Sequence, residues 1–294
     1  MRYSSPVLRQ RLLLGPILVV LLIGAVWLDE YLERIWRTPG LVFVPIMALI
    51  WTLAGVEITG VFVRRSIAAS RAVTSAAVLL GLATSSFSKG DLAQVSGVAV
   101  VCTAAALVLL MSLVFYSRGH NVEGVVASSA ATLLAFVYLG LMGGFLFVIR
   151  KDFDGWLVLG VLLVTKSYDI GAYFFGRAFG RHKLIPWLSP GKTWEGLFGG
   201  LAVSTLTGWL GAELGARWGV GFQQLQGWHG AAVGLLFGFV GQLGDLIASL
   251  LKRDAGMKDY SSALPGFGGV LDVLDSPLLV APVAYWVLGA LAAA

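Results

Sequence analysis

The chain alternates long apolar stretches with short polar connections along almost its whole length. Roughly nine stretches approach the length, about 20 residues, that a helix needs to cross a hydrocarbon core of about 30 Å. They lie near 12–28, 41–63, 72–87, 94–116, 124–149, 156–176, 196–215, 229–251 and 270–292. This pattern predicts an all-α fold: a polytopic integral membrane helical bundle with about nine transmembrane helices.

Composition supports a bilayer as the solvent of this chain. Of its 294 residues 57% are hydrophobic and 13% are charged, and the mean hydropathy is +0.84, which is unusual for soluble domains. The net charge of +5 is dispersed over many connections. We therefore expect no nucleic-acid partner, because that would need a continuous basic surface, and we expect anionic lipids and phosphorylated substrates instead.

Lysine and arginine are concentrated in alternate connections. Positively charged connections tend to stay in the cytoplasm, so the N-terminus is predicted inside and the C-terminus outside, with Arg150 and Lys151 as the main exception. No cleavage site follows the first apolar stretch, which we read as a retained span. The small size and the lack of a transit peptide favour a multi-pass protein of a bacterial (cell) inner membrane whose active site faces the cytoplasm.

Polar chemistry is unevenly distributed between two predicted domains. Residues 1–150 read as N-terminal transmembrane helices that serve as scaffold, in oligomerisation or in lipid access, and 151–294 read as a C-terminal catalytic transmembrane domain. In the second domain charged residues interrupt apolar sequence. An ionised side chain at mid-membrane costs about 2.5–3.5 kcal/mol, so three polar clusters there require an explanation.

The first cluster contains Lys166, Asp169, Tyr173 and Arg177. Their spacing of i, i+3, i+7 and i+11 places all four on one face of a helix. A polar stripe that binds substrate is one interpretation. The other is an ion pair between Lys166 and Asp169 that only tightens the bundle.

The second cluster is the connection 177–195, in which Pro190-Gly191 breaks the helix before Lys192 and Thr193. Backbone N–H groups at a helix start, together with a lysine, suit a phosphate. The full spacing of a phosphate-binding loop is absent, however, and we expect no strand before this segment. The alternative is a basic loop that touches lipid head groups.

The third cluster spans 244–276 and draws carboxylates from two helices. Asp245, Ser249 and Lys252 share one helical face, and Asp272 and Asp275 lie at i and i+3 on the next span. Two carboxylates with water and phosphate oxygens suit Mg²⁺. A structural salt-bridge network is the alternative interpretation.

At these positions the sequence resembles the phosphatidate cytidylyltransferase family, also called CDP-diacylglycerol synthases. The C-terminal pattern of that family reads S-x-x-K-R-x4-K-D-x5-P-G-H-G-G-x-x-D-R-x-D. The matching residues are Ser249, Lys252, Arg253, Lys258, Asp259, Pro265, Gly266, Gly268, Gly269, Asp272 and Asp275. A second shared stretch supplies Asp169, Ala172, Tyr173, Gly176, Phe179, Gly180, Ser189, Pro190, Lys192, Thr193, Glu195 and Gly196. The chain departs from the pattern at Phe267, where the family has histidine, and at Val273, where it has arginine.

The resemblance implies a reaction in which CTP and phosphatidate give CDP-diacylglycerol and diphosphate, as a step of phospholipid biosynthesis. CTP and membrane phosphatidate would be the partners and Mg²⁺ the cofactor, and a homodimer is compatible with the sequence. The expected catalytic residues are Lys192, Lys252, Arg253, Lys258 and Asp259. The expected substrate-binding residues are Asp169, Tyr173, Ser189, Thr193, Glu195, Ser249, Gly268 and Gly269, and the expected metal ligands are Asp245, Asp272 and Asp275.

Three other functions remain open on the sequence alone. A membrane lipid kinase that uses CTP or ATP would share the architecture but would release CDP or ADP. A secondary transporter would use intramembrane charges to bind ions, although the two halves show no paired interrupted helices. A catalytically silent relative would act as a scaffold.

Overall fold

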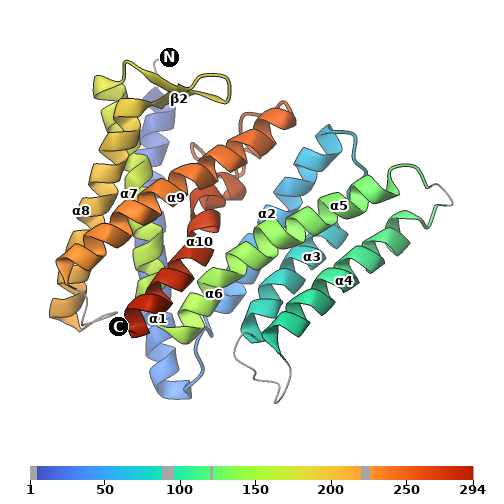
Figure 1. Cartoon of the computed structure of the whole chain (residues 1–294), viewed down its shortest axis with the longest axis horizontal. Coiled ribbons are helices and arrows are strands. Elements are labelled where there is room, and N and C mark those ends of the chain that lie inside the picture. The colour runs from blue at the N-terminus through green and yellow to red at the C-terminus, as the bar shows by residue number, and fades with distance from the viewer. Residues whose placement is uncertain (1–4, 88–95, 120–121, 220–225, 294) are drawn as a thin grey trace. The chain divides into compact units, whose positions relative to one another are not determined.

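The computed structural model is built almost entirely of helices (Figure 1), and it describes residues 5–87, 96–119, 122–219 and 226–293. The α-helices of these segments are α1 (Ser5–Trp36), α2 (Phe43–Arg64), α3 (Arg71–Thr84), α4 (Gly97–Tyr116), α5 (Val125–Ala135), α6 (Met142–Asp152), α7 (Gly155–Phe179), α8 (Trp194–Trp218), α9 (Gly227–Asp254) and α10 (Val270–Ala293). A short 3₁₀ turn, η1 (Ser85–Phe87), follows α3, and the segment η2 (Phe136–Leu141) joins α5 to α6.

The expected all-α membrane architecture is confirmed. Each of the nine predicted apolar stretches coincides with a helix, although residues 41, 42, 96 and 124, near the starts of three stretches, are not helical. Residues 94 and 95 lie outside the described residues. Among the described helices seven are long and apolar enough to cross a bilayer, counting α5, η2 and α6 as one span. The other two fall short for different reasons: α3 has only 14 residues, whereas α8 has 25 but a more polar composition.

Polar side chains define where several helices begin. Ser70, Asp154 and Thr193 immediately precede α3, α7 and α8, and each side chain accepts a hydrogen bond from a backbone N–H of the first turn. Such caps satisfy donors that have no partner within the helix. Gly219, with φ of 67°, ends α8 in the left-handed conformation that a side chain would disfavour.

The span Val125–Asp152 contains a π-helical segment, η2, at its centre. A π segment widens the helix and removes a carbonyl from the regular pattern of hydrogen bonds. Leu139 lies in this segment, and its carbonyl oxygen accepts a hydrogen bond of 2.8 Å from the Trp51 indole. The side chain of α2 thereby stabilises an irregularity in a helix that lies far away in the sequence.

The connection 177–195 contains a local element that the sequence patterns did not predict. The segment before it is a helix, α7, and not a strand, as expected, but the connection itself folds into an antiparallel hairpin of β1 (Lys183–Ile185) and β2 (Ser189–Thr193). Lys183 pairs with Thr193 and Ile185 with Ser189. A two-stranded hairpin of this length has too few residues to show a hydrophobic alternation, so the helix-breaking proline and glycine dominated the sequence pattern.

The chain forms two compact units. Unit 1 consists of Met1–Val148 and Leu251–Val273, and unit 2 consists of Ile149–Leu250 and Leu274–Ala294. The segment Leu251–Val273 therefore belongs to the same unit as the N-terminal helices. The predicted assignment of separate roles to 1–150 and 151–294 stays a prediction.

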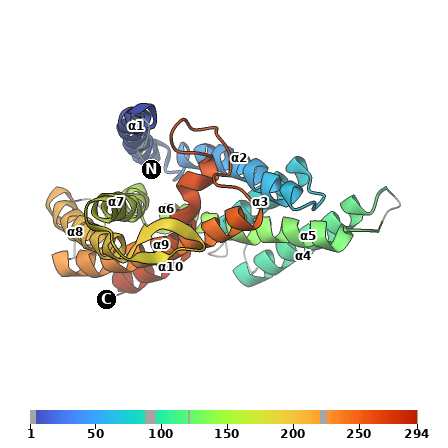
Figure 2. The same cartoon turned by 90° about the horizontal axis from the view of Figure 1, so that it is seen from above.

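Within unit 1, α2, α3 and η2 approach one another closely at glycines, and α2 and α3 run side by side (Figure 2). A Cβ atom on Gly55 would lie 3.1 Å from the Ser75 backbone, and one on Gly81 would lie 2.8 Å from Gly140. Small residues of this kind let helix backbones pack in a bilayer, where burial of apolar surface supplies little driving force.

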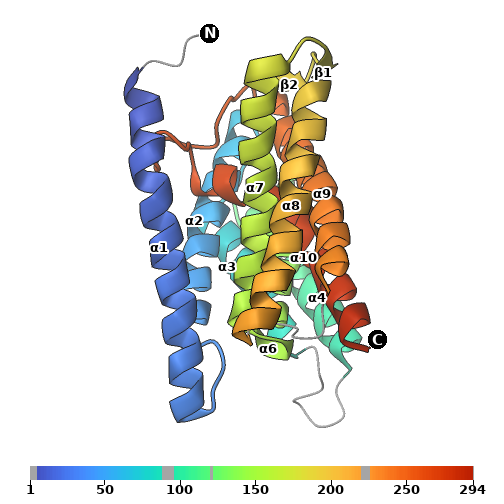
Figure 3. The same cartoon turned by 90° about the vertical axis from the view of Figure 1, so that its left-hand side faces the viewer.

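Within unit 2, glycines perform the same role between α7, α8 and α9, which run alongside one another (Figure 3). A Cβ atom on Gly171 of α7 would lie 2.7 Å from Val203 of α8. A Cβ atom on Gly208 of α8 would collide with the Gly230 carbonyl of α9 and would lie 2.9 Å from Gly234. Several of the many glycines in the sequence thus lie at contacts between helices where no side chain would fit.

We predict that Gly208→Ala destabilises the protein by about 1–3 kcal/mol, because its methyl group would force α8 and α9 apart. Gly211→Ala is the matched control: it lies one turn further along α8, where a Cβ atom meets nothing within 4 Å. The control should be neutral or stabilising by up to about 1 kcal/mol, because alanine favours a helix. Thermal unfolding of both variants in detergent measures the difference, and equal melting temperatures would contradict close packing at Gly208.

Candidate active site

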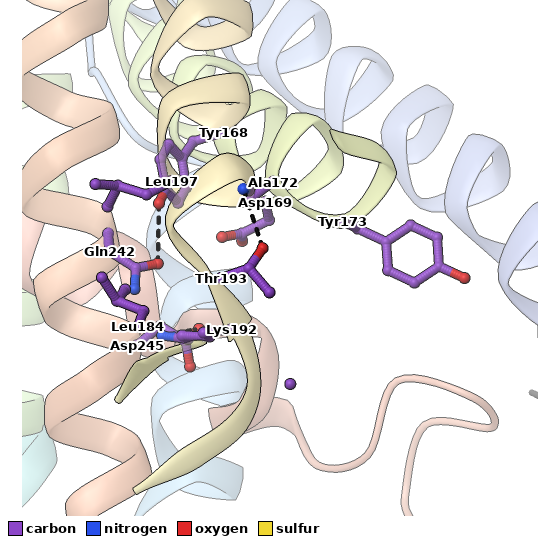
Figure 4. A pocket seen from close by; sticks show the side chains of 12 residues that line it. Tyr168, Asp169, Ala172, Tyr173, Leu184, Lys192, Thr193, Leu197, Gln242 and Asp245 are labelled. Carbon is purple, nitrogen blue, oxygen red and sulfur yellow. Dashed lines mark hydrogen bonds and ion pairs between the residues drawn. The ribbon is translucent and has the colours of Figure 1, made fainter. Parts of the chain in front are cut away.

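A polar cavity of about 220 Å³ lies in unit 2 where α7, the hairpin, the start of α8 and α9 meet (Figure 4). Its lining combines charged, hydroxyl and amide groups with small residues. These residues are Tyr168, Asp169, Ala172, Tyr173, Leu184, Gly191, Lys192, Thr193, Gly196, Leu197, Gln242 and Asp245. Five of them, Asp169, Tyr173, Lys192, Thr193 and Asp245, were expected as site residues from the sequence, and the other seven were not.

Lys192 and Asp245 form the central charge pair of this cavity. Lys192 Nζ lies 2.8 Å from Asp245 Oδ2, and the two side chains are 17% and 28% exposed. Nζ is buried, and apart from this ion pair no hydrogen-bond partner is found for it among the described residues. Strand β2 therefore holds a buried ammonium group whose donors are available to an anion that enters the cavity.

A second set of charges connects α7 with α10 inside unit 2. Lys166 Nζ lies 2.9 Å from Asp169 Oδ2 and 3.7 Å from Asp275 Oδ1. The predicted ion pair between Lys166 and Asp169 is confirmed. Asp169 nevertheless lines the cavity, so the pair and a role in ligand binding are compatible.

Uncharged polar contacts fix the shape of the cavity. The Tyr168 hydroxyl donates a hydrogen bond of 3.1 Å to Gln242 Oε1, which links α7 to α9 (Figure 4). Thr193 Oγ1 accepts a hydrogen bond of 3.1 Å from Gly196 N, which places the start of α8 against the cavity. Gly196 also lies close to the Ala172 carbonyl of α7, and a side chain there would not fit.

Ser189 and Glu195, two of the expected substrate-binding residues, do not line this cavity, and Tyr173 lines it without turning its ring inward. The Tyr173 ring points away from it (Figure 4), and its hydroxyl accepts a hydrogen bond from Arg177. Ser189 pairs with Ile185 in the hairpin. Glu195 accepts hydrogen bonds from the backbone N–H of His182, and its Oε1 lies 2.7 Å from His182 Nδ1.

A separate polar cluster lies in unit 1, around Asp272. Its Oδ1 atom accepts a hydrogen bond of 2.7 Å from Lys252, and its Oδ2 atom accepts bonds of 2.8 Å from Tyr260 N and Gly269 N. Both side chains are largely buried: the Lys252 side chain is 10% exposed and the Asp272 side chain is 6% exposed. The Lys252 ammonium also lies 5.2 Å from the centroid of the Tyr260 ring, which adds a cation–π contact.

The remaining expected catalytic residues are close to this cluster in the sequence, and their side chains are on the surface. Arg253, Lys258 and Asp259 are exposed, and the Arg253 guanidinium donates to the Met257 carbonyl. Gly268 has φ of 94° and closes a tight turn with Leu264. Phe267 stands where the family pattern has histidine, and its ring lies 3.8 Å from the position of a Cβ atom on Gly15.

The expected metal ligands are distributed between the two units. Asp245 lies in unit 2 beside Ser249, whose hydroxyl is 3.5 Å from Asp245 Oδ1. Asp275 lies in the same unit but accepts hydrogen bonds from Ser276, whereas Asp272 lies in unit 1. Within the segments that the structure describes, no group of three or more His, Cys, Asp or Glu side chains gathers as a ready-made metal site.

Two polar residues with well-defined partners were not identified from the sequence patterns. Gln242 joins the cavity lining, and Glu57 of α2 accepts hydrogen bonds from Ser261, Val270 and Leu271. The signal for Glu57 was an acidic residue inside the apolar stretch 41–63, a place where an ionised side chain needs a reason.

The contact between Glu195 and His182 leads to a prediction about pH. Hydrogen bonds from its own backbone N–H and from the His182 side chain lower the pKa of Glu195 from 4.5 to about 2. The ionised form therefore anchors the hairpin fully above about pH 4.5 and loses its effect only as the pH falls towards 2. Limited proteolysis should show a protected hairpin at both pH 7 and pH 5. Glu195→Gln should expose it at pH 7, whereas Glu213→Gln, near the end of α8, should not.

Comparisons with known proteins agree with the character of this site. Residues 9–291 match the protein family described as the cytidylyltransferase family. The phosphatidate cytidylyltransferase of Pseudomonas aeruginosa is 40% identical over 127 residues, which make up 43% of this chain and 45% of the relative. That of Staphylococcus aureus is 38% identical over 155 residues, or 52% and 56% of the two chains.

A relative without an assigned function is equally similar. The uncharacterized protein YnbB of Escherichia coli is 37% identical over 159 residues, which make up 54% of this chain and 48% of the relative. The chain spans about half the length of the curated relatives that it matches. Because the family match covers nearly all of the sequence, this chain belongs to the cytidylyltransferase family.

Proposed function

We propose that this protein transfers CMP from CTP to phosphatidate in the membrane, forming CDP-diacylglycerol and diphosphate. Membership of the cytidylyltransferase family and relatives named phosphatidate cytidylyltransferase support the proposal. The observation that carries it is Lys192: a buried ammonium group that is ion-paired with Asp245, finds no hydrogen-bond partner among the described residues, and lies on a polar cavity among membrane-spanning helices. Such a group suits a phosphate better than a neutral ligand.

The proposed reaction exchanges one phosphoanhydride bond for another. A phosphate oxygen of phosphatidate forms a bond to the α-phosphorus of CTP, and the bond from that phosphorus to the bridging oxygen breaks, so that diphosphate leaves. The second pKa of a phosphate monoester is about 6, so the attacking oxygen is already ionised at neutral pH. The protein therefore needs no strong general base, and its main tasks are to align two anions and to offset their repulsion.

The chain supplies cationic and neutral groups for these tasks. Lys192 would bind a phosphate of CTP, and the Thr193 hydroxyl on the same cavity would orient it. Lys252, buried beside Asp272 in unit 1, stays a predicted catalytic residue, as do Arg253, Lys258 and Asp259. The glycine-rich contacts of α7, α8 and α9 would hold the cavity wall in place and limit the access of water.

Mg²⁺ is the cofactor that we propose, and the cavity lining fits it. Asp169 and Asp245 both line the cavity, and Mg²⁺ typically uses one or two carboxylates together with water and phosphate oxygens. When bound it would neutralise charge on the phosphates and on the leaving diphosphate. The predicted roles of Asp272 and Asp275 as metal ligands stay predictions, as does a homodimer.

The protein is a polytopic membrane protein, and we propose that its site faces the cytoplasm at the inner membrane. The hairpin with Lys192 belongs to a connection that the lysine and arginine distribution assigns to the cytoplasmic side. That position would give the site access both to soluble CTP and to lipid phosphates of the inner leaflet.

The test is the formation of products by the purified protein in detergent with CTP, Mg²⁺ and phosphatidate. We expect CDP-lipid and diphosphate in equal amounts. Lys192→Met should lower kcat/KM by about 100-fold or more, because it removes a charge that stabilises the transition state. Lys183→Met is the matched control, since Lys183 lies on the other strand of the hairpin, is exposed and does not line the cavity.

Three outcomes would contradict the proposal. Folded wild-type protein that forms neither product would exclude the reaction under these conditions. Release of CDP or ADP in place of diphosphate would identify a lipid kinase. Equal loss of activity in the variants at Lys192 and Lys183 would show that the buried ammonium group has no special role, provided that both variants keep the melting temperature of the wild type.

A further inference from the structure

Glu57 is a carboxylate in the middle of α2 whose two oxygen atoms are both occupied by donors from a distant part of the chain. Oε1 accepts a hydrogen bond of 2.7 Å from the Ser261 hydroxyl and one of 2.9 Å from Val270 N. Oε2 accepts a hydrogen bond of 2.8 Å from Leu271 N. Three donors directed at one carboxyl group match its ionised, acceptor-only form. All four residues belong to unit 1.

Two of these donors are the first backbone N–H groups of α10, which begins at Val270. The first N–H groups of a helix have no partner within it and are normally satisfied by a Ser, Thr, Asp or Asn side chain just before the helix. Here that position is occupied by Gly269, which has no side chain. A Cβ atom on Gly269 would lie 2.6 Å from a Glu57 oxygen, so α2 supplies the cap and glycine leaves room for it.

Asp272 completes the same helix start from the other side. As the third residue of α10 it accepts a hydrogen bond of 2.8 Å from Gly269 N, which is one half of a capping box. Its other oxygen accepts from Lys252. The carboxylates of Glu57 and Asp272 thus accept hydrogen bonds from the three consecutive backbone N–H groups of 269–271 at the start of α10. Because Asp272 belongs to this first turn, its position depends on the position of the turn.

We propose that Glu57 is a positioning residue for the transfer reaction. It fixes the segment 260–272, and thereby the buried pair of Lys252 and Asp272, by capping α10 from α2. This inference rests on the proposed function, and it assigns part of the catalytic arrangement to the N-terminal half of the chain. The interaction of an anion with a helix N-terminus makes the carboxylate preferable to a neutral side chain at this place.

Asp29 shows what a cap with a purely structural role looks like in the same unit. It is 1% exposed, and its Oδ1 atom accepts hydrogen bonds of 2.7 Å and 3.1 Å from Val42 N and Phe43 N at the start of α2. None of these bonds involves a residue of the segment 260–272. Asp29 therefore provides a control in which a helix cap is lost without direct effect on Asp272.

The first arm of the test measures hydrogen exchange, which does not depend on any activity. In Glu57→Gln an amide can accept only through one atom, so at least one of the three donors loses its partner. Exchange at the amides of 260–272 should rise by about tenfold or more, while exchange in α4 and α8 stays the same. Asp29→Ala should raise exchange at the start of α2 and leave 260–272 unchanged. Asp29→Asn replaces it if the alanine variant does not fold.

The second arm measures turnover of the same samples. Glu57→Gln should lower kcat by about 10- to 100-fold, the range expected for misplaced catalytic groups, and should leave KM for CTP nearly unchanged. Asp29→Ala should keep kcat although its melting temperature falls by at least as much. This split separates positioning from general loss of stability.

Specific results would overturn the inference. Unchanged exchange at 260–272 in Glu57→Gln would show that the cap does not hold this segment. Increased exchange with wild-type kcat would show that the segment is held but that the reaction does not need it. A wild-type protein without transferase activity would refute the proposed function instead, and the exchange arm would still decide whether Glu57 fixes α10.

Discussion

An ionised side chain inside an apolar helix has to be given donors or a counter-charge, because the surrounding bilayer offers neither. Five acidic residues in the described helices satisfy that constraint in one of two ways, and Asp272 uses both. Asp169 pairs with a lysine of its own helix, and Asp245 and Asp272 each pair with a lysine of another element. Asp29 and Glu57 face the free N–H groups of another helix. The first way creates places where an anion can compete for a lysine, whereas the second way only fixes backbone.

Close approach of helices is the second condition for the cavity. At Gly171, Gly200 and Gly234 a Cβ atom would meet side-chain or backbone atoms of a neighbouring helix at less than about 3 Å. Without side chains there, α7, α8 and α9 bring Tyr168, Gln242 and Asp245 within reach of the hairpin. The polar cavity is thus a product of packing by the smallest residue, and its charged groups come from three separate elements.

Much of the fold and part of the site follow from the sequence. Apolar stretches of membrane-spanning length gave the helices, because length and hydropathy are local properties. The i, i+3 pair of Lys166 and Asp169 also follows, because a helix fixes that spacing. The meeting of Lys192 with Asp245 does not, since it depends on how the hairpin packs on α9. The same holds for Glu57, whose partners in α10 lie 213 and 214 positions away.

The cap on α10 also bears on how the protein is made. A chain emerging from the ribosome completes α2 long before α10, so the acceptor for the last helix is in place when that helix arrives. A fragment that begins after the first four helices would contain every residue of the family pattern but would have no partner for Val270 N and Leu271 N. The C-terminal half is therefore not a self-sufficient folding unit at the helix that carries Asp272.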